Sequence, residues 1–252
     1  MLQVIIKQDL TEAEDVLWEQ CHGGCAVNAV MSDFSIAFRN DLTQRKYQKI
    51  FIGKNAHASE PWKGRNAAFE ASKEILCLEY VPECVKRMCL FIQESLTSFP
   101  NLWDNKSEED LGIVTVNLGK IHKKEKVVLY YFDIRYPYGI KAEQVLDRIK
   151  QIAVKFYMEM IEKKDNPPLY ISKDSELVVK LMNLYQEEMG KIVKPIAIGG
   201  CTYAKSFPNM VAFGPIFPEQ DNKIHQTDES VHLKDLYCAI KLIMYAMVEL
   251  AR

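Results

Sequence analysis

The sequence predicts an α+β protein in which antiparallel strands combine with amphipathic helices. Between residues 34 and 39, apolar side chains alternate with small or polar ones, the period of two expected of a half-buried strand. Two alternating runs, 113–118 and 127–136, flank a charged turn at 122–126 and predict a hairpin. Residues 141–162 carry an apolar stripe opposite a charged face, which is typical of a helix on the surface of a globular domain.

The other elements of the first half follow from the same kinds of pattern. A second strand is expected over 47–54, before a segment too rich in glycine, proline and polar residues to be regular. Helices are expected over 66–78, which lacks glycine and proline, and over 83–96, which follows a proline. The polar segment 100–110 is expected to be a loop.

The strongest internal boundary is the Asp-Asn-Pro-Pro segment at 165–168, because two prolines cannot continue a helix. It divides the chain into residues 1–167 and 168–252. Beyond it, a helix is expected over 174–189 with a glycine as its C-terminal cap, followed by short apolar pieces between glycines and prolines. The last helix, from about Leu233, has so wide an apolar face that protein is expected to cover it.

Composition and charge exclude several classes of protein. The 252 residues include 32 Lys and Arg against 34 Asp and Glu, a net charge of −2, which argues against a basic surface for nucleic acid. The apolar fraction of 48% and the charged fraction of 26% are those of a globular protein. No run approaches the roughly 18 apolar residues of a membrane helix, and no signal peptide is visible. Seven cysteines are expected as reduced thiols and predict a cytoplasmic protein. The charge balance and the lack of a long apolar run predict that it has no nucleic-acid or membrane partner.

Several residues with reactive or metal-binding side chains are expected to be structural. The Cys-His-x-x-Cys segment at 21–25 matches no zinc-binding spacing, and no second pair of ligands follows it. Cys84 and Cys89 lie on a predicted helix and are expected to be buried like small apolar residues. His122 is expected to be solvated in the charged turn. No Cys-His pair that would make Cys201 a nucleophile can be argued from spacing.

Two stretches of the first half favour a chemical role. The segment 53–67 places His57 between small residues before a proline and a helix start, so its imidazole lies at a rigid corner where it can donate to an oxyanion. At 133–139, a strand ends at Tyr-Pro and leaves Arg135 near its tip, on the same face as Asp133. A guanidinium offers two parallel N–H donors that match the two oxygens of a carboxylate.

A third stretch, 198–229, lies in the second half. Its adjacent glycines, Gly199 and Gly200, let the backbone approach a ligand closely. It ends with His225 in a polar loop beside two carboxylates. Each of the three stretches alone has an ordinary structural explanation, but their order along the chain is much more specific.

In this order, the blocks VNAVMSDFSIAF, GKNAHASEPWKGRNA, FDIRYPYG, GGCTYA, VAFGPIFP and HQTDE resemble the C-terminal part of the co-catalytic metallopeptidases that include carnosinases and aminoacylases. The sequence looks most like the PepV-type, or Xaa-His-type, dipeptidases. In that family a lid interrupts a di-zinc α/β catalytic domain. The resemblance implies that residues 1–167 form a ferredoxin-like antiparallel lid, and residues 168–252 the C-terminal segment of the catalytic domain.

The resemblance also implies roles for single residues. In the lid, His57 matches the histidine that reaches over the metals and stabilises the tetrahedral intermediate. Asn28 matches the asparagine of the substrate pocket, and Arg135 matches the arginine that grips the C-terminal carboxylate of the substrate. The implied substrate is a dipeptide or short peptide, attacked by a metal-activated water with a glutamate as general base.

In the second segment, the resemblance assigns Gly199, Gly200 and Thr202 to the turn that binds the substrate backbone. It assigns His225 as the one zinc ligand of this segment. The sequence departs from the family at Cys201, where a third glycine is usual, which could narrow the pocket. Other departures are Lys205 in place of an arginine, and Met31 and Ser32 in place of a proline-containing step.

The sequence lacks the family's His-x-Asp strand end, the glycine-rich stretch with the bridging aspartate, and the Glu-Glu pair with the general base. We therefore expect a truncated piece of such an enzyme that does not bind zinc tightly or hydrolyse peptides alone. Its expected partners are a peptide substrate, the missing N-terminal catalytic half and, through its uncovered apolar faces, a second copy of the chain. The alternative is a non-catalytic peptide-binding or oligomerisation module that descends from such an enzyme.

Overall fold

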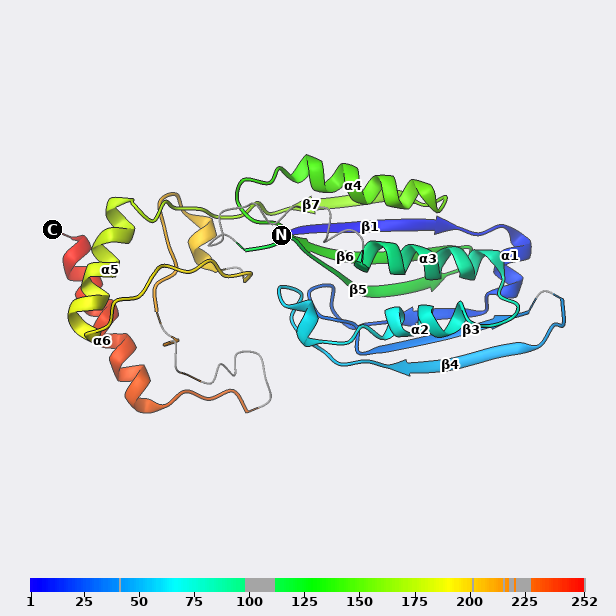
Figure 1. Ribbon diagram of the computed structural model, residues 1–252, viewed down its shortest axis with the longest axis horizontal. Coiled ribbons are helices and arrows are strands. Elements are labelled where there is room, and N and C mark those ends of the chain that lie inside the picture. Colours follow the sequence, from blue (N-terminus) through cyan, green and yellow to red (C-terminus); the bar gives the residue numbers. More distant parts are fainter. Residues whose placement is uncertain are drawn as a thin grey trace. The chain divides into compact units, whose positions relative to one another are not determined.

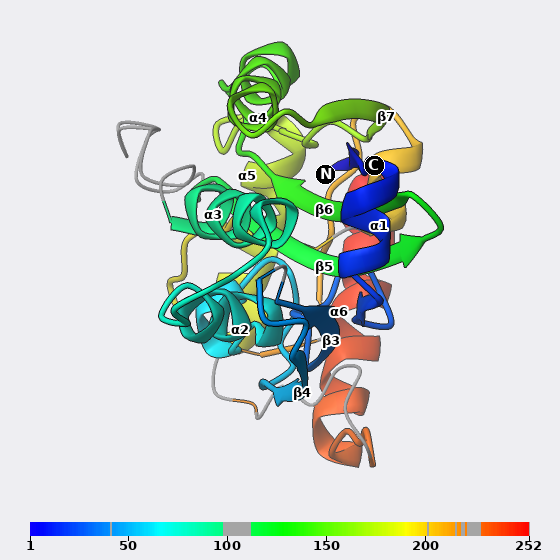
Figure 2. The same cartoon turned by 90° about the vertical axis from the view of Figure 1, so that its right-hand side faces the viewer.

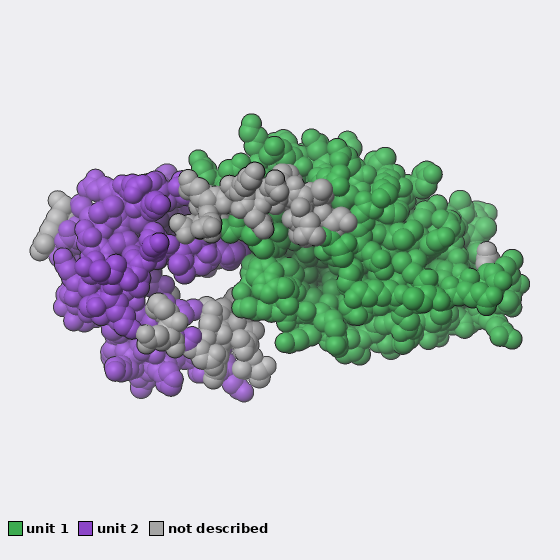
Figure 3. Space-filling view, viewed as in Figure 1, with its two compact units in different colours: residues 1–168 green, residues 169–252 purple. Residues whose placement is uncertain are grey.

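The computed structural model describes residues 1–40, 42–97, 112–200, 202–214, 216–217, 220 and 228–251 (Figure 1). The chain forms two compact units, residues 1–168 (unit 1) and 169–252 (unit 2), which Figure 3 distinguishes by colour. The division falls directly after the double proline of the Asp-Asn-Pro-Pro segment.

Unit 1 is built on one seven-stranded sheet in the order β4-β3-β2-β5-β6-β1-β7, in which every neighbouring pair is antiparallel. The strands are β1 (Leu2–Asp9), β2 (Gln20–Gly23), β3 (Asp33–Arg39), β4 (Lys46–Ile52), β5 (Thr115–Lys124), β6 (Val127–Arg135) and β7 (Glu159–Asp165). Because the chain returns to place β1 between β6 and β7, the two termini of unit 1 lie in the same part of the sheet.

Three helices of unit 1 lie along one face of this sheet: α2 (Ala67–Ile75), α3 (Glu83–Thr97) and α4 (Ala142–Lys155) (Figure 2). Two shorter helical segments are α1 (Glu12–Leu17) and the 3₁₀ turn η1 (Pro61–Lys63). The core lies between the helices and the sheet, where Phe91 of α3 packs edge-on against Tyr130, Phe132 and Phe156. This mixture of helices and antiparallel strands confirms the predicted α+β class.

The expected strands at 34–39 and 47–54, the expected helices at 66–78 and 83–96, and both hairpin strands are confirmed within a few residues. The predicted charged turn is wrong in its extent, because β5 continues to Lys124 and only Glu125 and Lys126 form the turn. Glu125 takes a left-handed conformation there, with φ of 52°. His122 is therefore a strand residue, although its side chain is exposed as expected. The predicted loop at 100–110 lies outside the described residues.

The predicted helix at 141–162 is wrong beyond Lys155. The chain turns at Tyr157, which has a φ of 58°, and continues as β7 along β1. The residues of β7 favour a helix when taken alone, but β1 offers a row of backbone partners, and pairing overrides this weak local preference. β1 itself was not predicted as a strand, although its apolar residues Leu2, Val4 and Ile6 alternate and are fully buried.

Unit 2 contains α5 (Glu176–Met189), the 3₁₀ turn η3 (Tyr203–Ser206) and α6 (Leu233–Leu250). The helices expected at 174–189 and from Leu233 are confirmed, and Gly190 caps α5 in the left-handed conformation, with φ of 64°. Its core is small, with Leu181 and Leu184 of α5 buried against Ala246 of α6. Among the short apolar pieces expected between glycines and prolines, the one at 215–218 is described only at residues 216 and 217. None of the helices in the described part of the chain combines the length and hydropathy needed to span a bilayer.

Candidate functional site

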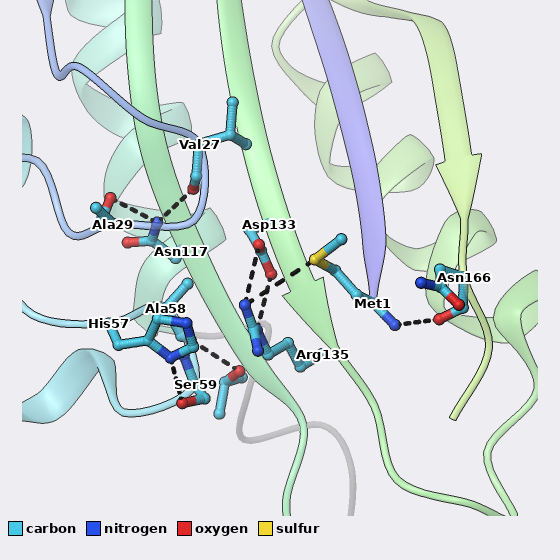
Figure 4. Close-up of polar contacts among 11 residues, drawn as sticks. Met1, Val27, Ala29, His57, Ala58, Ser59, Asn117, Asp133, Arg135 and Asn166 are labelled. Atoms are coloured by element: carbon cyan, nitrogen blue, oxygen red, sulfur yellow. Dashed lines mark hydrogen bonds and ion pairs between the residues drawn. The ribbon is translucent and has the colours of Figure 1, made fainter. Parts of the chain in front are cut away.

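Two loops of unit 1 carry predicted site residues and are joined backbone to backbone. Asn28 lies on the loop after β2, and His57 lies on the loop after β4. The amide of Val30 donates to the carbonyl of Ala56 at 2.8 Å, and the amide of Ala58 donates to the carbonyl of Asn28 at 3.0 Å. These bonds bring the Asn28 and His57 loops together at the end of the sheet where β6 ends in Arg135 (Figure 4).

Two polar side chains of β5 hold these loops against the sheet. The Asn117 Nδ2 donates to the carbonyl of Val27 and to the carbonyl of Ala29, both at 2.9 Å. The Thr115 hydroxyl donates to the carbonyl of Ala58 at 3.2 Å. Both side chains are buried, so these bonds form where water competes little and where losing one would leave a carbonyl unsatisfied.

Glycines allow the close approach of the first loop to β5. The β5–β6 register shifts between Leu118 and Lys120, which leaves Gly119 as an extra residue. A Cβ on Gly119 would lie 2.2 Å from the carbonyl oxygen of Val27, and Gly24 has a φ of 77°. Both positions therefore require glycine, and the loop with Asn28 depends on this contact.

Arg135 forms a buried ion pair with a neighbour on its own strand. Its Nε lies 3.1 Å from Oδ1 of Asp133, and its Nη2 lies 3.4 Å from Oδ2, so the carboxylate is held by two guanidinium nitrogens (Figure 4). Asp133 is completely buried, and burial raises its pKa, while the positive charge and hydrogen bond of Arg135 act in the opposite direction. The pair fixes the plane of the guanidinium at the end of β6.

The ring of His57 is oriented by its own loop. The backbone amide of Ser59 donates to Nδ1 at 3.4 Å, and the Ser59 hydroxyl oxygen lies 2.6 Å from the same nitrogen. With Nδ1 as an acceptor, the neutral imidazole carries its proton on Nε2 and is an N–H donor there.

The structure thus brings together Asn28, His57 and Arg135, and it adds three residues that the sequence reasoning did not assign to the site. These are Thr115, Asn117 and Asp133. The sequence does contain a signal for these residues, because polar residues at alternate positions of two adjacent apolar strands lie on the same face of the sheet. The strand register places Thr115 opposite Arg135 and Asn117 opposite Asp133, which sequence periodicity alone does not specify.

The remaining predicted site residues belong to unit 2. Gly199 and Gly200 lie in the irregular segment after α5, and a Cβ added to Gly200 would meet nothing within 4 Å. The Thr202 hydroxyl accepts a hydrogen bond from the amide of Ala204 at 3.3 Å and so caps η3. His225 and Cys201 lie outside the described residues. Among the residues that are described, no group of three or more His, Cys, Asp or Glu side chains could hold a metal ion.

The chain is similar in sequence to proteins named as putative dipeptidases. No model of a known protein family matches the chain. It is 33% identical over 204 residues to "Putative dipeptidase YtjP" of Bacillus subtilis, covering 79% of this chain and 43% of that protein. It is 31% identical over 235 residues to a "Putative dipeptidase" of Staphylococcus epidermidis, covering 87% of this chain and 50% of that protein.

A solved structure has a similar fold. The aminoacylhistidine dipeptidase of Vibrio alginolyticus matches with a TM-score of 0.51 and 17% identity, over 99% of this chain and 57% of that one. The chain spans about half the length of the curated relatives that it matches. The resemblance predicted from the sequence motifs is confirmed: the chain is similar to proteins named as putative dipeptidases over about half of their length, and its fold is similar to that of an aminoacylhistidine dipeptidase.

Proposed function

We propose that this chain forms the lid and the C-terminal catalytic segment of a zinc-dependent dipeptidase. The enzyme would hydrolyse short peptides that have a free C-terminal carboxylate. The observation that carries the proposal is the buried Arg135–Asp133 pair, which lies at the end of the sheet beside the joined loops of Asn28 and His57. The similarity to proteins named as dipeptidases supports the same reaction class.

Arg135 would bind the substrate carboxylate. Bidentate recognition of a carboxylate requires a guanidinium whose plane is held in one orientation, and Asp133 supplies this constraint through two nitrogens. The pair is buried, so little of the orientation is lost to side-chain motion or to competition from water. Asp133 acts here as a positioning residue.

His57 would stabilise the oxyanion that develops when the peptide carbonyl is attacked. An N–H donor at Nε2 has the required polarity, and the Ser59 contacts to Nδ1 orient the ring before substrate binds. Asn28 would contribute to the substrate pocket from the loop that is tied to the His57 loop. Gly199, Gly200 and Thr202 would bind the substrate backbone.

Zinc is proposed for the assembled enzyme, where it would supply a water of lowered pKa. The described residues of this chain do not form a zinc site, because no three potential ligands converge. His225 would contribute one ligand, and a catalytic zinc needs about three from protein. The other ligands and the general base would come from a separate N-terminal catalytic half.

The proposal is tested by complementation. The chain is purified alone and after co-expression with the N-terminal portion of the Bacillus subtilis relative, and zinc content and dipeptide hydrolysis are measured. We expect activity only in the complemented sample. There, Arg135→Ala should cost about 2–4 kcal/mol in transition-state binding of free-acid dipeptides and much less for dipeptide amides. Arg135→Lys is the control that keeps a cation beside Asp133.

Two results would contradict the proposal. One is that the chain alone binds two zinc ions tightly and cleaves dipeptides. The other is a complemented enzyme in which Arg135→Ala affects acids and amides equally.

A second candidate function is a peptide-binding or oligomerisation module without catalysis. It is favoured by the apolar surface of α6, where Tyr237, Met244 and Met247 are exposed, and by Ile50 and Ile52 on the edge strand β4. Exposed apolar patches beyond a few hundred Å² usually mark contact surfaces. Sedimentation analysis at tens of micromolar chain should then reveal self-association that persists without substrate, and a well-behaved monomer would contradict it.

A further inference from the structure

Two histidines of unit 1 lie directly opposite each other on neighbouring antiparallel strands. His22 of β2 pairs with His122 of β5. Their sequence neighbours Cys21 and Ile121 are buried on the helix-covered side of the sheet, so both imidazoles project from the opposite side, and both residues are exposed. Directly opposed residues have Cβ atoms about 4.5–5.5 Å apart, which lets two imidazoles reach one point between the strands.

A third residue orients one of the rings. The side-chain amide of Gln20 lies on the same face two residues before His22, with its Nε2 at 3.1 Å from Nδ1 of His22. A half-turn of the amide group exchanges its nitrogen and oxygen, after which the oxygen accepts the Nδ1 proton and Nε2 presents a lone pair outward. Metal-bound histidines are usually held in this way by a hydrogen bond to the second ring nitrogen.

We propose that His22 and His122 form a binding site for one divalent transition-metal ion, with Gln20 orienting the first ligand. Imidazole nitrogens suit Zn²⁺, Ni²⁺ and Cu²⁺, with metal–nitrogen distances of about 2.0–2.1 Å for zinc. Water completes the coordination. Mg²⁺ and Ca²⁺ prefer oxygen ligands and are not bound.

The site lies where the sheet is most weakly joined. Within the described residues, β2 and β5 pair only at His22↔His122 and Gly23↔Ile121, whereas β5 and β6 pair along their whole length. These two pairs connect the β4-β3-β2 part of the sheet to the β5-β6-β1-β7 part. An ion held by one histidine from each part cross-links the two parts. Because it binds the folded chain and not the unfolded one, it stabilises the folded state increasingly as its concentration rises above the dissociation constant. This site is independent of the proposed dipeptidase function.

The experiment is a titration of the purified full chain with NiCl₂ by calorimetry, repeated with ZnCl₂ and MgCl₂, together with thermal unfolding. We expect one Ni²⁺ per chain and a rise in Tm with Ni²⁺ or Zn²⁺ but not with Mg²⁺. His22→Gln and His122→Gln should each weaken Ni²⁺ binding by about tenfold or more. Removing a group that merely orients a metal ligand already costs about tenfold in affinity, and removing the ligand itself should cost at least as much. Gln20→Ala should weaken it while leaving the stoichiometry unchanged.

Matched controls separate this site from the other ligands of the chain. His232→Gln, His225→Gln and Cys25→Ser should leave Ni²⁺ affinity and the rise in Tm unchanged. Since His22 and His122 are exposed, their replacement should leave the far-UV circular dichroism of the metal-free chain unchanged. Wild-type affinity in either single His→Gln variant would overturn the proposal, as would loss of binding in His225→Gln. Because no readout requires hydrolysis, failure of the dipeptidase proposal would leave this test intact.

Discussion

Helices α3 and α6 show how differently the two units bury apolar side chains. The 15-residue α3 of unit 1 buries seven residues, whereas the 18-residue α6 of unit 2 buries only Ala239, Leu242 and Ala246. Yet α6 is apolar at most of its positions, and several of its large side chains are exposed. Unit 1 buries its apolar side chains in a core of its own. Helix α6 of unit 2 is as apolar as a buried helix, but most of its apolar side chains are exposed.

This difference separates self-sufficient structure from structure that requires a partner. A sheet with helices on one face can bury its apolar side without further protein. A helix that is apolar around most of its circumference is usually covered on several sides. The proposed N-terminal catalytic half would supply that cover for unit 2, and unit 1 would fold without it.

The largest expected contrast is in the reactivity of thiols. Burial raises the pKa of Cys84 in α3 to about 12 and also raises the pKa of Cys89. At pH 8, about one Cys84 in ten thousand is then a thiolate, which is the reactive form. We expect iodoacetamide to modify Cys238 of α6, which is not fully buried, more than a thousandfold faster, as measured by mass spectrometry of peptides.

The exposed Cys77 of unit 1 is the internal control and should react without delay. Modification of Cys84 as fast as that of Cys77 would show that the core of unit 1 opens readily, and the contrast between the units would be lost.

The next contrast is in the cost of cavities. Phe91→Ala should destabilise unit 1 by about 3–5 kcal/mol, because the ring is fully buried among three aromatic side chains. Leu184→Ala in the small core of unit 2 should cost about 2 kcal/mol or less. All three tryptophans of the sequence belong to residues 1–168, so urea unfolding followed by fluorescence reports unit 1, and circular dichroism reports both units. Equal losses for the two variants would break the comparison.

A comparable cost is expected where unit 1 buries charge. Arg135→Ala removes the partner of the fully buried Asp133 and should destabilise unit 1 by about 3–5 kcal/mol. Adding Asp133→Asn to this variant removes the uncompensated charge and should recover part of the loss. Urea unfolding of the single and double variants measures this. A double variant less stable than Arg135→Ala would mean that the ion pair is not the source of the cost.

The smallest of these effects concerns the loops of the site. Asn117→Ala leaves the carbonyls of Val27 and Ala29 without their donor and should cost about 1–3 kcal/mol in the free energy of unfolding. The backbone resonances of residues 27–29 should shift while those of α4 stay in place. Unchanged loop resonances would show that β5 does not hold this loop.

Local sequence patterns were sufficient to predict most of the helices and the β5–β6 hairpin. The strand at 34–39 and the capped helices can be predicted from windows of about ten residues, because periodicity and caps are local signals. β7 could not be predicted in this way. Its sequence suits a helix, and only pairing of Glu159 with Lys7, distant in the chain, makes it a strand.

The residues of the candidate site likewise divide into those that local sequence motifs indicate and those that depend on strand pairing. Arg135, His57 and Asn28 could be located from motif order, and their placement near one another follows from strand ends and loops. The contributions of Asp133 and Asn117 depend on the β5–β6 register and on the bulge at Gly119, which are properties of paired strands. The sequence therefore predicted Asn28, His57 and Arg135 as site residues, and their contact with substrate stays a prediction. Asp133 and Asn117 were not predicted as site residues, and the structure shows them bonded to Arg135 and to the Asn28 loop.

The position of β1 has a consequence for how the molecule is made. Leu2 pairs with Ile134 on one side and with Asp165 on the other, so β1 has no partner strand until β6, far along the chain, has been synthesised. Pairings so distant in sequence close slowly, because the entropy of a long loop is lost before any contact is gained. The nascent chain must therefore keep the apolar residues of β1 from aggregating throughout that interval, which makes unit 1 a candidate substrate for chaperones during its synthesis.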